Sequence, residues 1–468
     1  MNAAPTNDVG HVRSRSFWLD GLDDAALAPR PALPGDRDVD VAIVGAGFTG
    51  LWTAHYLLRR DPTLRVALVD ANVAGYGASG RNGGWCSALL PMSLPAIEAR
   101  HGRAQAIAMQ AAMNDTVDEV GREARRLGID CQYAKGGYVH LARSAAQAAR
   151  VTDDLGEARR FGLTDDDVRW LTAHEANALV GATGVRGGSY TPHCAALQPA
   201  LLVRGLADAV SRAGATIYEG TPVTSIEPGR CRTAHGTLRA EVIVRATEGF
   251  TATLAGERRT LVPLYSLMIA TEPLPPSLWA TLRMDGRPTW NDARRTIIYG
   301  QRTADDRLAF GGRGAPYHFG SAVDPAFDHH EATHLALRAV LVELFPSLAD
   351  VAITHAWGGP LGVPRDWTCS VGFDPTTGMA WAGGYVGDGV ATTNLAGRTL
   401  AALITREQDP LTTLAWVGHR SPRWEPEPLR WLGITAASRM PAIIDRAEEA
   451  DRRPNRLAVS ILGRLTGR

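Results

Sequence analysis

A glycine-rich hexapeptide near the N-terminus constrains the fold of this chain more than any other feature. The residues Gly45-Ala46-Gly47-Phe48-Thr49-Gly50 directly follow a short β-branched run at 39–44 and precede a helical stretch at 51–60. A second short strand is expected at 65–70. A strand, a glycine turn, a helix and a strand within about 30 residues make one βαβ unit. The sequence therefore predicts an α/β fold.

Each glycine of this turn has a physical role in binding a dinucleotide. Gly45 permits the tight turn, Gly47 lets the backbone approach a pyrophosphate, and Gly50 allows close packing of the helix. The helix N-terminus supplies free N–H groups and a favourable dipole for phosphate. Asp70 ends the next strand, 20 residues beyond Gly50, where an acid can bind the ribose hydroxyls. We therefore expect a dinucleotide site; the alternative is a glycine turn in an unrelated α/β protein.

A second glycine loop follows just past Asp70. Residues 77–84 have the sequence GASGRNGG, with one arginine among the glycines. Such a loop suits a second anionic surface of the same ligand, with its backbone N–H groups facing phosphate or flavin. The alternative is a flexible surface loop. An ordinary NAD enzyme would instead show a catalytic domain after a continuous nucleotide domain, so the loop favours FAD.

Composition and charge exclude several classes of function. The 49 basic and 49 acidic residues cancel, whereas a nucleic-acid partner normally needs a basic face. The N-terminus has no apolar core of a secretory signal, and no stretch approaches the roughly 20 apolar residues of a membrane span. Five dispersed cysteines without a CxxC pair fit reduced thiols better than disulfides or a zinc site. We expect a cytoplasmic enzyme without a metal site.

The length of 468 residues favours two domains. Nucleotide-type strands and helices are expected at the start, in the middle (201–246) and near the end (383–405). Between them, the segment from about 100 to 175 has helical patterning, and 261–320 is strand-rich. The simplest account is two domains interleaved in sequence, with the cofactor domain assembled from three pieces. Residues 1–36 are polar and proline-broken, which indicates a leader draped on the surface.

Longer motifs give a specific resemblance. The matching pieces are VAIVGAGFTGLWTAHYL, VALVD, GYGASGRNGGW, TPVTSIEPG, RATEGF, WGGPLGVPRDW and GGYVGDGVATTNLAGRTLAALI. They span about residues 38 to 405, and YGASGRNGG is the most discriminating of them. The chain resembles the glycine oxidase and D-amino-acid oxidase superfamily of flavoproteins. Within it, the chain looks most like gamma-glutamylputrescine oxidase-type amine oxidoreductases.

The resemblance implies a fold class: a Rossmann-type FAD-binding domain interleaved with an α+β substrate domain built on an antiparallel sheet. The expected FAD-binding pieces are residues 37–95, 190–255 and 355–408. The expected substrate-domain pieces are 96–189 and 256–354. A leader at 1–36 and a helical tail at 409–468 complete the chain.

The resemblance also implies where FAD binds. The first loop, Asp70 and the 77–84 loop would hold it, the backbone of Val223 would contact the adenine, and the block 383–390 would lie near the flavin pyrimidine edge. A glycine loop that opens a helix presents N–H groups and a positive dipole end, which suits negative charge on reduced flavin. The alternative for this block is close backbone packing. The expected cofactor contacts are Gly45, Gly47, Phe48, Thr49, Gly50, Asp70, Ala71, Gly77, Ala78, Ser79, Arg81, Asn82, Gly83, Gly84, Trp85, Val223, Thr247, Gly387, Asp388, Gly389 and Val390.

In this superfamily flavin N5 accepts a hydride from the C–H beside an amine nitrogen, and the imine product hydrolyses. Three differences from better-known relatives bear on the expected substrate, the reaction with oxygen and the attachment of the flavin. Gly84 and Ala391 stand where sarcosine-oxidising relatives hold a carboxylate with basic side chains. The strand at 307–314 lacks the lysine that promotes reaction with oxygen, and Lys135, the only lysine, lies elsewhere. No cysteine matches a covalent flavin link, and Cys369 fits a structural role, so dissociable FAD is expected.

Substrate contacts are less defined by the sequence, and no catalytic triad is evident. The candidates are Asp388, Arg313, Tyr265, Tyr299 and Trp357, with Trp85 as a further part of the cavity wall, because aromatic walls suit aliphatic amines. Asp388 would hold a cationic amine or cap the following turn. Arg313, flanked by glycines, suits a substrate carboxylate or phosphonate. Each aromatic candidate has packing in the core as its alternative.

Other readings stay open at this point. A flavin monooxygenase would use NAD(P)H, but its usual GD motif with a proline-containing helix start is replaced here by GDGVATTNLAGR. A non-catalytic flavoprotein sensor is a second alternative. The electron acceptor is oxygen or another acceptor such as a quinone. The tail from 410 to 468, with ten arginines and six acids, could dock on another subunit or on an anionic membrane, or lie against its own domain.

Overall fold

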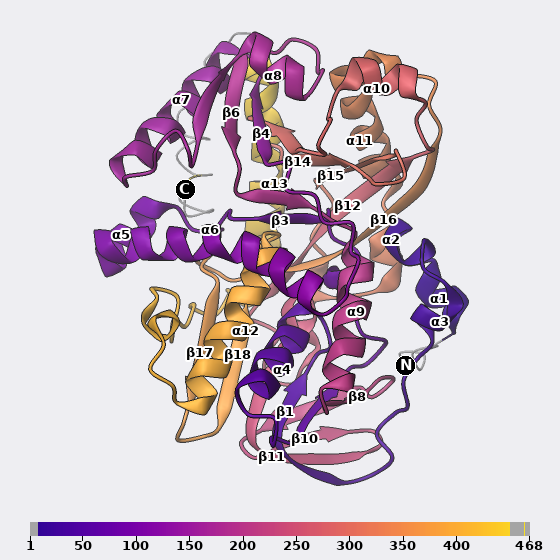
Figure 1. Ribbon diagram of the computed structural model, residues 1–468, viewed down its shortest axis with the longest axis vertical. Coiled ribbons are helices and arrows are strands. Elements are labelled where there is room, and N and C mark those ends of the chain that lie inside the picture. Colours follow the sequence, from indigo (N-terminus) through magenta and orange to yellow (C-terminus); the bar gives the residue numbers. More distant parts are fainter. Residues whose placement is uncertain (1–7, 450–462, 464–468) are drawn as a thin grey trace.

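The computed structural model describes residues 8–449 and residue 463, and two large sheets dominate it (Figure 1). The first sheet is parallel around β1, with β1 paired to β2 on one side and to β11 on the other. Its strands β1 and β2 end in runs of buried apolar residues, as expected where helices cover both faces. In spatial order the strands are β17 (Ser370–Asp374), β18 (Met379–Gly383), β11 (Gly236–Arg245), β1 (Arg37–Val44), β2 (Val66–Val69) and β8 (Thr216–Tyr218), with β10 (Arg230–Thr233) paired to β11 and β9 (Val223–Glu227) paired to β10.

The second sheet has eight strands and is antiparallel except for one parallel pair, β13 with β4. It joins two separate parts of the sequence, as an interleaved arrangement requires. In spatial order the strands are β16 (Ile353–Val363), β12 (Val262–Thr271), β15 (Leu308–Arg313), β14 (Ile298–Arg302), β13 (Thr289–Asp292), β4 (Tyr138–Ala142), β6 (Gly187–Thr191) and β5 (Arg169–Thr172). The whole of β16 pairs with β12, so the boundary expected at residue 355 would divide a strand of this sheet.

Helices cover both sheets. Around the first sheet lie α4 (Phe48–Arg60), α6 (Arg103–Arg126), α9 (Pro199–Arg212) and α12 (Gly389–Thr405), and the second carries α7 (Ala145–Arg160), α8 (Ala173–Leu179), α10 (Pro276–Leu282) and α11 (Glu331–Leu344). The short α5 (Leu94–His101) precedes α6. Between the sheets, β3 (Trp85–Ser87) pairs with β7 (Cys194–Ala196).

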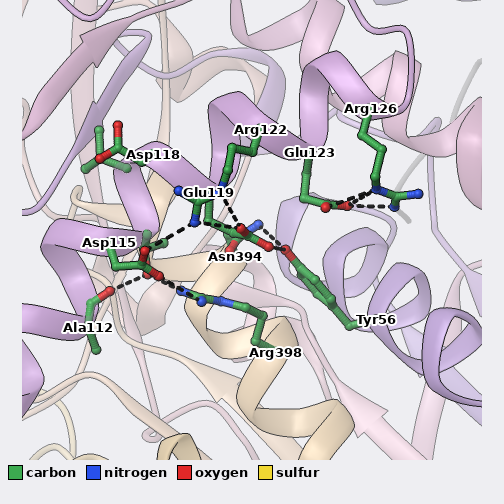
Figure 2. Close-up of polar contacts among 12 residues, drawn as sticks. Tyr56, Ala112, Asp115, Asp118, Glu119, Arg122, Glu123, Arg126, Asn394 and Arg398 are labelled. Atoms are coloured by element: carbon green, nitrogen blue, oxygen red, sulfur yellow. Dashed lines mark hydrogen bonds and ion pairs between the residues drawn. The ribbon is translucent and has the colours of Figure 1, made fainter.

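A polar network joins α6 to the two helices that begin at glycine turns, α4 and α12 (Figure 2). The Tyr56 hydroxyl donates to Glu119 at 3.1 Å and accepts from the Asn394 amide at 2.9 Å. Arg398 pairs with Asp115 at 3.2 Å. Tyr56 and Asn394 are buried, and buried hydrogen bonds between helices restrict the relative positions of those helices. The network therefore fixes where the N-termini of α4 and α12 point.

The N-terminal segment is packed into the molecule, so the prediction that it is draped on the surface is wrong for its described part. It forms α1 (Val9–Arg13), α2 (Phe17–Asp20) and α3 (Asp24–Leu27). Trp18 and Leu19 are 2% and 0% exposed. The Ser16 hydroxyl donates to the Gly80 carbonyl at 2.8 Å, and the Trp18 indole N–H donates to the Asn82 carbonyl at 2.7 Å. The prolines that suggested a surface course follow this buried part.

The C-terminal tail forms α13 (Leu429–Glu449), which lies against the domain of the second sheet. Asp445 accepts the backbone N–H groups of Arg295 at 2.6 Å and Thr296 at 2.8 Å, and Glu448 pairs with Arg150 at 2.7 Å. The described part of the tail thus packs on its own chain. Among the described residues, every helix is too short or too polar to cross a membrane.

Candidate functional site

A cavity of about 240 Å³ lies at the carboxyl ends of β1 and β2, where open α/β sheets bind ligands. Val44 and Val69, the last residues of these strands, line it. Fifteen of the expected cofactor contacts line it too: Gly45, Gly47, Phe48, Thr49, Asp70, Ala71, Gly77, Ala78, Ser79, Asn82, Val223, Thr247, Gly387, Gly389 and Val390. The structure therefore brings three distant parts of the chain around one cavity.

The turn before α4 is built so that only glycine fits. Gly45 has φ +110°, and a Cβ there would lie 2.4 Å from the Ala246 carbonyl oxygen. At Gly50 a Cβ would lie 2.0 Å from the Gly45 carbonyl oxygen. Gly50 does not line the cavity; it lets α4 pack on the turn, as the sequence suggested. The result is a backbone surface open to a phosphate group at the start of a helix.

Asp70 orders the same turn. Its carboxylate accepts the N–H of Ala46 at 2.8 Å and that of Asn72 at 2.9 Å. Burial raises the pKa of Asp70 to about 6. Ser79 connects the second glycine loop to the first, because its hydroxyl accepts the Phe48 N–H at 2.8 Å. The two glycine loops therefore form one surface.

Two polar residues at this cavity, Glu248 and Tyr385, were not among the expected cofactor contacts. Both line it. Glu248 follows β11 and accepts the N–H groups of Gly384 at 2.8 Å and Tyr385 at 3.3 Å. The Tyr385 hydroxyl lies 3.1 Å from the Thr49 hydroxyl, which ties the last glycine block to α4. An acid three residues after the carboxyl end of a central strand, as in RATEGF, was the signal available for Glu248.

Burial raises the pKa of the Glu248 carboxyl to about 7. Because the folded-state pKa lies above the ordinary 4.5, the contribution of Glu248 to stability is complete below pH 4.5 and is lost as the pH rises through 7. We expect the free energy of unfolding of cofactor-free protein to fall by about 3 kcal/mol over this window because of Glu248. Denaturant unfolding at several pH values measures it. Glu248→Gln should flatten the fall, whereas Glu331→Gln, at an exposed position of α11, should not; equal curves for both variants would contradict this role.

A second cavity of about 500 Å³ adjoins the first. Ala78, Asn82, Leu361, Gly387 and Val390 line both. Of the expected substrate contacts, Tyr299, Arg313, Asp388 and Trp85 line the second cavity. These side chains come from β14, β15, the start of α12 and β3, respectively.

Tyr265 and Trp357 line neither cavity. Tyr265 is 3% exposed and packs edge-on against His318 and Phe327. Trp357 is 1% exposed, packs against Trp18, and donates its indole N–H to the Arg81 carbonyl at 2.9 Å. On β12 and β16 both side chains therefore lie in the core, which was the alternative considered for each aromatic candidate.

The side chain of Arg81 is also held by hydrogen bonds within the protein. It borders the second cavity, but its guanidinium donates to Asp328 at 2.5 Å and to the Gly358 carbonyl at 3.1 Å. Gly83 borders the same cavity. Gly84 lines neither cavity: it has φ +68°, and a Cβ there would lie 2.1 Å from the Gln301 amide nitrogen. No basic side chain could replace Gly84 without moving Gln301, which agrees with the departure from sarcosine-oxidising relatives.

A further polar group in the second cavity was not foreseen. Tyr138, His140 and Asn291 line it. The Tyr138 hydroxyl donates to the Asn291 side-chain oxygen at 2.7 Å, and His140 Nδ1 contacts the same oxygen. Burial lowers the pKa of His140, so this side chain is neutral at neutral pH. The alternation of Tyr138 and His140 on one strand was hidden because their segment had a helical pattern overall.

The glycine cradle, the helix N-termini and Asp70, the acid that follows β2, fit the dinucleotide FAD. A family model described as "DAO: FAD dependent oxidoreductase" matches residues 40–403. A protein of Rhizobium meliloti named "Probable oxidoreductase OrdL" is 29% identical over 393 residues, covering 82% of this chain and 87% of that protein. Gamma-glutamylputrescine oxidoreductase of Escherichia coli is 27% identical over 397 residues, covering 84% and 89%.

Solved structures agree on the fold. The crystal structure of glycine oxidase from Geobacillus kaustophilus superposes with a TM-score of 0.68 at 24% identity, covering 82% of this chain and 99% of that one. The predicted fold class, a Rossmann-type FAD-binding domain with a substrate domain, is thereby confirmed. The resemblance drawn from the sequence motifs is confirmed as well. The chain therefore belongs to the DAO family of FAD-dependent oxidoreductases and uses FAD as its cofactor.

Proposed function

We propose that this enzyme oxidises the C–N bond of an amine or amino acid that lies in the second cavity, beside FAD held in the first. The shared lining carries the proposal, because a molecule in the second cavity abuts whatever occupies the first. FAD, when bound, supplies the acceptor for a hydride from the carbon next to nitrogen. The relatives named for gamma-glutamylputrescine and for glycine support a nitrogen-bearing substrate.

The side chains of the second cavity position the substrate. Trp85, Tyr138 and Tyr299 form an aromatic wall, with ring centroids 5.3 Å apart for Trp85 and Tyr138 and 6.1 Å for Trp85 and Tyr299. Such a wall binds the alkyl part of an amine and excludes water. Asp388 and Arg313 place charges of both signs on the lining, and the Arg313 guanidinium also donates to the Val386 carbonyl at 2.5 Å. The imine that oxidation leaves takes up water and gives a carbonyl compound and a smaller amine.

Cysteine chemistry supports dissociable FAD. Cys194 borders the second cavity, and burial raises its pKa to about 12. A protonated thiol is a poor nucleophile. Burial also raises the pKa of Cys369. We therefore propose that FAD is released unmodified when the protein is denatured.

Anaerobic titration of the purified yellow protein with a panel of amines tests the function. The panel holds polyamines, their gamma-glutamyl conjugates, N-alkyl amino acids, D-amino acids and aminophosphonates. Bleaching by one class supports the proposal. Bleaching by NADPH alone would support a monooxygenase, and a flavin that nothing bleaches would support a sensor.

The only lysine of the chain is not placed to promote reaction of the flavin with oxygen. Lys135 pairs with Asp118 at 2.6 Å, and it lines neither cavity. We therefore expect slow reoxidation of the flavin when air is admitted.

Trp85→Ala is expected to weaken amine binding about fivefold, because the loss of one aromatic contact to an amine costs on the order of 1 kcal/mol. FAD content should stay unchanged, since Trp85 borders the second cavity and not the first. The dissociation constant from the dependence of anaerobic bleaching on amine concentration measures the effect. Trp170→Ala, at a partly exposed position on β5, is the control. An unaltered dissociation constant in Trp85→Ala would contradict the assignment.

A further inference from the structure

The outer face of α13 is an unusual surface in this chain. Nine large hydrophobic side chains are exposed in the described part of the chain, and four of them lie on α13: Leu429, Trp431, Leu432 and Ile443. Their exposed fractions are 62%, 37%, 53% and 59%. A fifth, Phe319, lies beside the start of the helix, because its neighbour Gly320 donates its N–H to Glu427 at 2.9 Å. Exposed apolar groups gathered in one place mark an interaction surface.

The inner face of the same helix is fixed to the body of the protein. Asp445 and Glu448 are buried and bind the backbone near Arg295 and the side chain of Arg150. At the start of the helix, Glu427 accepts the Tyr317 hydroxyl at 2.7 Å and the Trp431 N–H at 2.9 Å. The helix is therefore anchored through its inner face, where Ile444 is buried, and its exposed apolar residues take no part in that packing.

Charge on α13 is divided between the two faces. Leu432, Arg439, Ile443 and Arg446 follow one another at helical spacing and are exposed, whereas the carboxylates of Asp445 and Glu448 face inward. From 429 to 468 the sequence has eight arginines against four acids. The outer face thus combines bulky apolar residues, a tryptophan and arginines, which is the composition of helices that lie on anionic membranes.

We propose that the outer face of α13 docks this enzyme on an anionic lipid surface. The charge of this face distinguishes an anionic lipid surface from a second copy of the chain as its partner. A second copy of the chain packed through the same face would bring Arg439 and Arg446 of one copy near those of the other. The sequence at 450–468, with five arginines and one acid, adds charge of the same sign. An anionic lipid surface attracts Arg439 and Arg446, and each basic side chain near such a surface contributes about 1 kcal/mol. Docking would place the enzyme beside membrane-dissolved electron acceptors.

Sedimentation of the holoenzyme with lipid vesicles tests this proposal. We expect binding to vesicles that contain phosphatidylglycerol and not to pure phosphatidylcholine, with a large loss at high salt. The double variant Leu432→Glu/Ile443→Glu should lose binding about tenfold or more, since it removes two apolar groups and adds two negative charges. Arg439→Glu/Arg446→Glu should weaken binding to the anionic vesicles in the same direction.

Leu335→Glu is the matched control, because Leu335 is 61% exposed on α11, outside this surface. Equal loss in this variant, or no binding of the wild type at low salt, would overturn the proposal. A concentration-dependent dimer in light scattering that Leu432→Glu abolishes would assign the face to a second copy instead. All positions are exposed, so the variants should keep their thermal midpoint and their yellow colour. The result is independent of which substrate bleaches the enzyme.

Discussion

Gly45→Ala is expected to yield protein that purifies without FAD. The added Cβ would lie 2.4 Å from the carbonyl oxygen and 3.0 Å from the carbonyl carbon of Ala246. The backbone at Gly45 and at Ala246 cannot move apart easily. The Ala246 N–H donates to the Val44 carbonyl at 2.9 Å, at the end of the paired strands β1 and β11. The backbone at φ +110° adds strain. Together these costs of about 3 kcal/mol or more correspond to at least a hundredfold loss of FAD affinity.

Flavin absorbance of the purified variant, followed by titration with FAD, measures this loss. Gly256→Ala separates the clash from the strain, because Gly256 has φ +81° but a Cβ added there would meet nothing within 4 Å. That variant should stay yellow and lose about 1 kcal/mol of stability at most. Circular dichroism shows whether Gly45→Ala still folds. A folded Gly45→Ala protein with wild-type affinity for FAD would show that the cradle is not the FAD site.

Asp328→Ala is expected to cost the protein about 3 to 5 kcal/mol of stability, the usual effect of removing one partner from a buried ion pair. Asp328 is 3% exposed and accepts hydrogen bonds from Arg81 and Arg15. Both guanidinium groups are buried. Without the carboxylate, two like charges would remain together away from water. Arg15 lies in the N-terminal segment and Arg81 in the second glycine loop, so Asp328 joins these two segments. Removing its carboxylate should also loosen the loop that carries Ser79 and Asn82.

Thermal and urea unfolding of the holoenzyme measure the stability of Asp328→Ala, and FAD retention during gel filtration reports on the loop. Asp165→Ala is the surface counterpart, because Asp165 pairs with Arg159 but its side chain is 80% exposed. Exposed pairs contribute about 0 to 1 kcal/mol. Asp328→Asn, which keeps one oxygen acceptor, should lie between alanine and wild type. Equal losses in Asp328→Ala and Asp165→Ala would mean that the buried pair does not hold the segments together.

Local spacing explains why the residues that line the first cavity could be predicted to lie together. The turn between β1 and α4 is encoded by three glycines within six residues, and Asp70 must follow at the end of the next parallel strand. Ser79 and Asn82 come from a loop only a few residues further. Each of these contacts depends on backbone geometry that short motifs determine. The distant block at 387–390 has the same local arrangement, a glycine turn at the start of a helix. Gly387, Gly389 and Val390 of this block line the first cavity.

The second cavity depended on the tertiary structure. Tyr138 and His140 meet Asn291 because β4 and β13, about 150 residues apart in sequence, lie side by side in parallel register. Nothing local separates Tyr299, which faces the cavity, from Tyr265, which packs on His318; only the position of each strand in the sheet does. The N-terminal segment is similar, since Trp18 is buried by partners at Asn82 and Trp357. The sequence by itself determined the backbone cradle of the first cavity, because that cradle is built from local turns. The tertiary structure alone decided the lining of the second cavity and the burial of the N-terminal segment, because both depend on contacts between side chains that are far apart in the sequence.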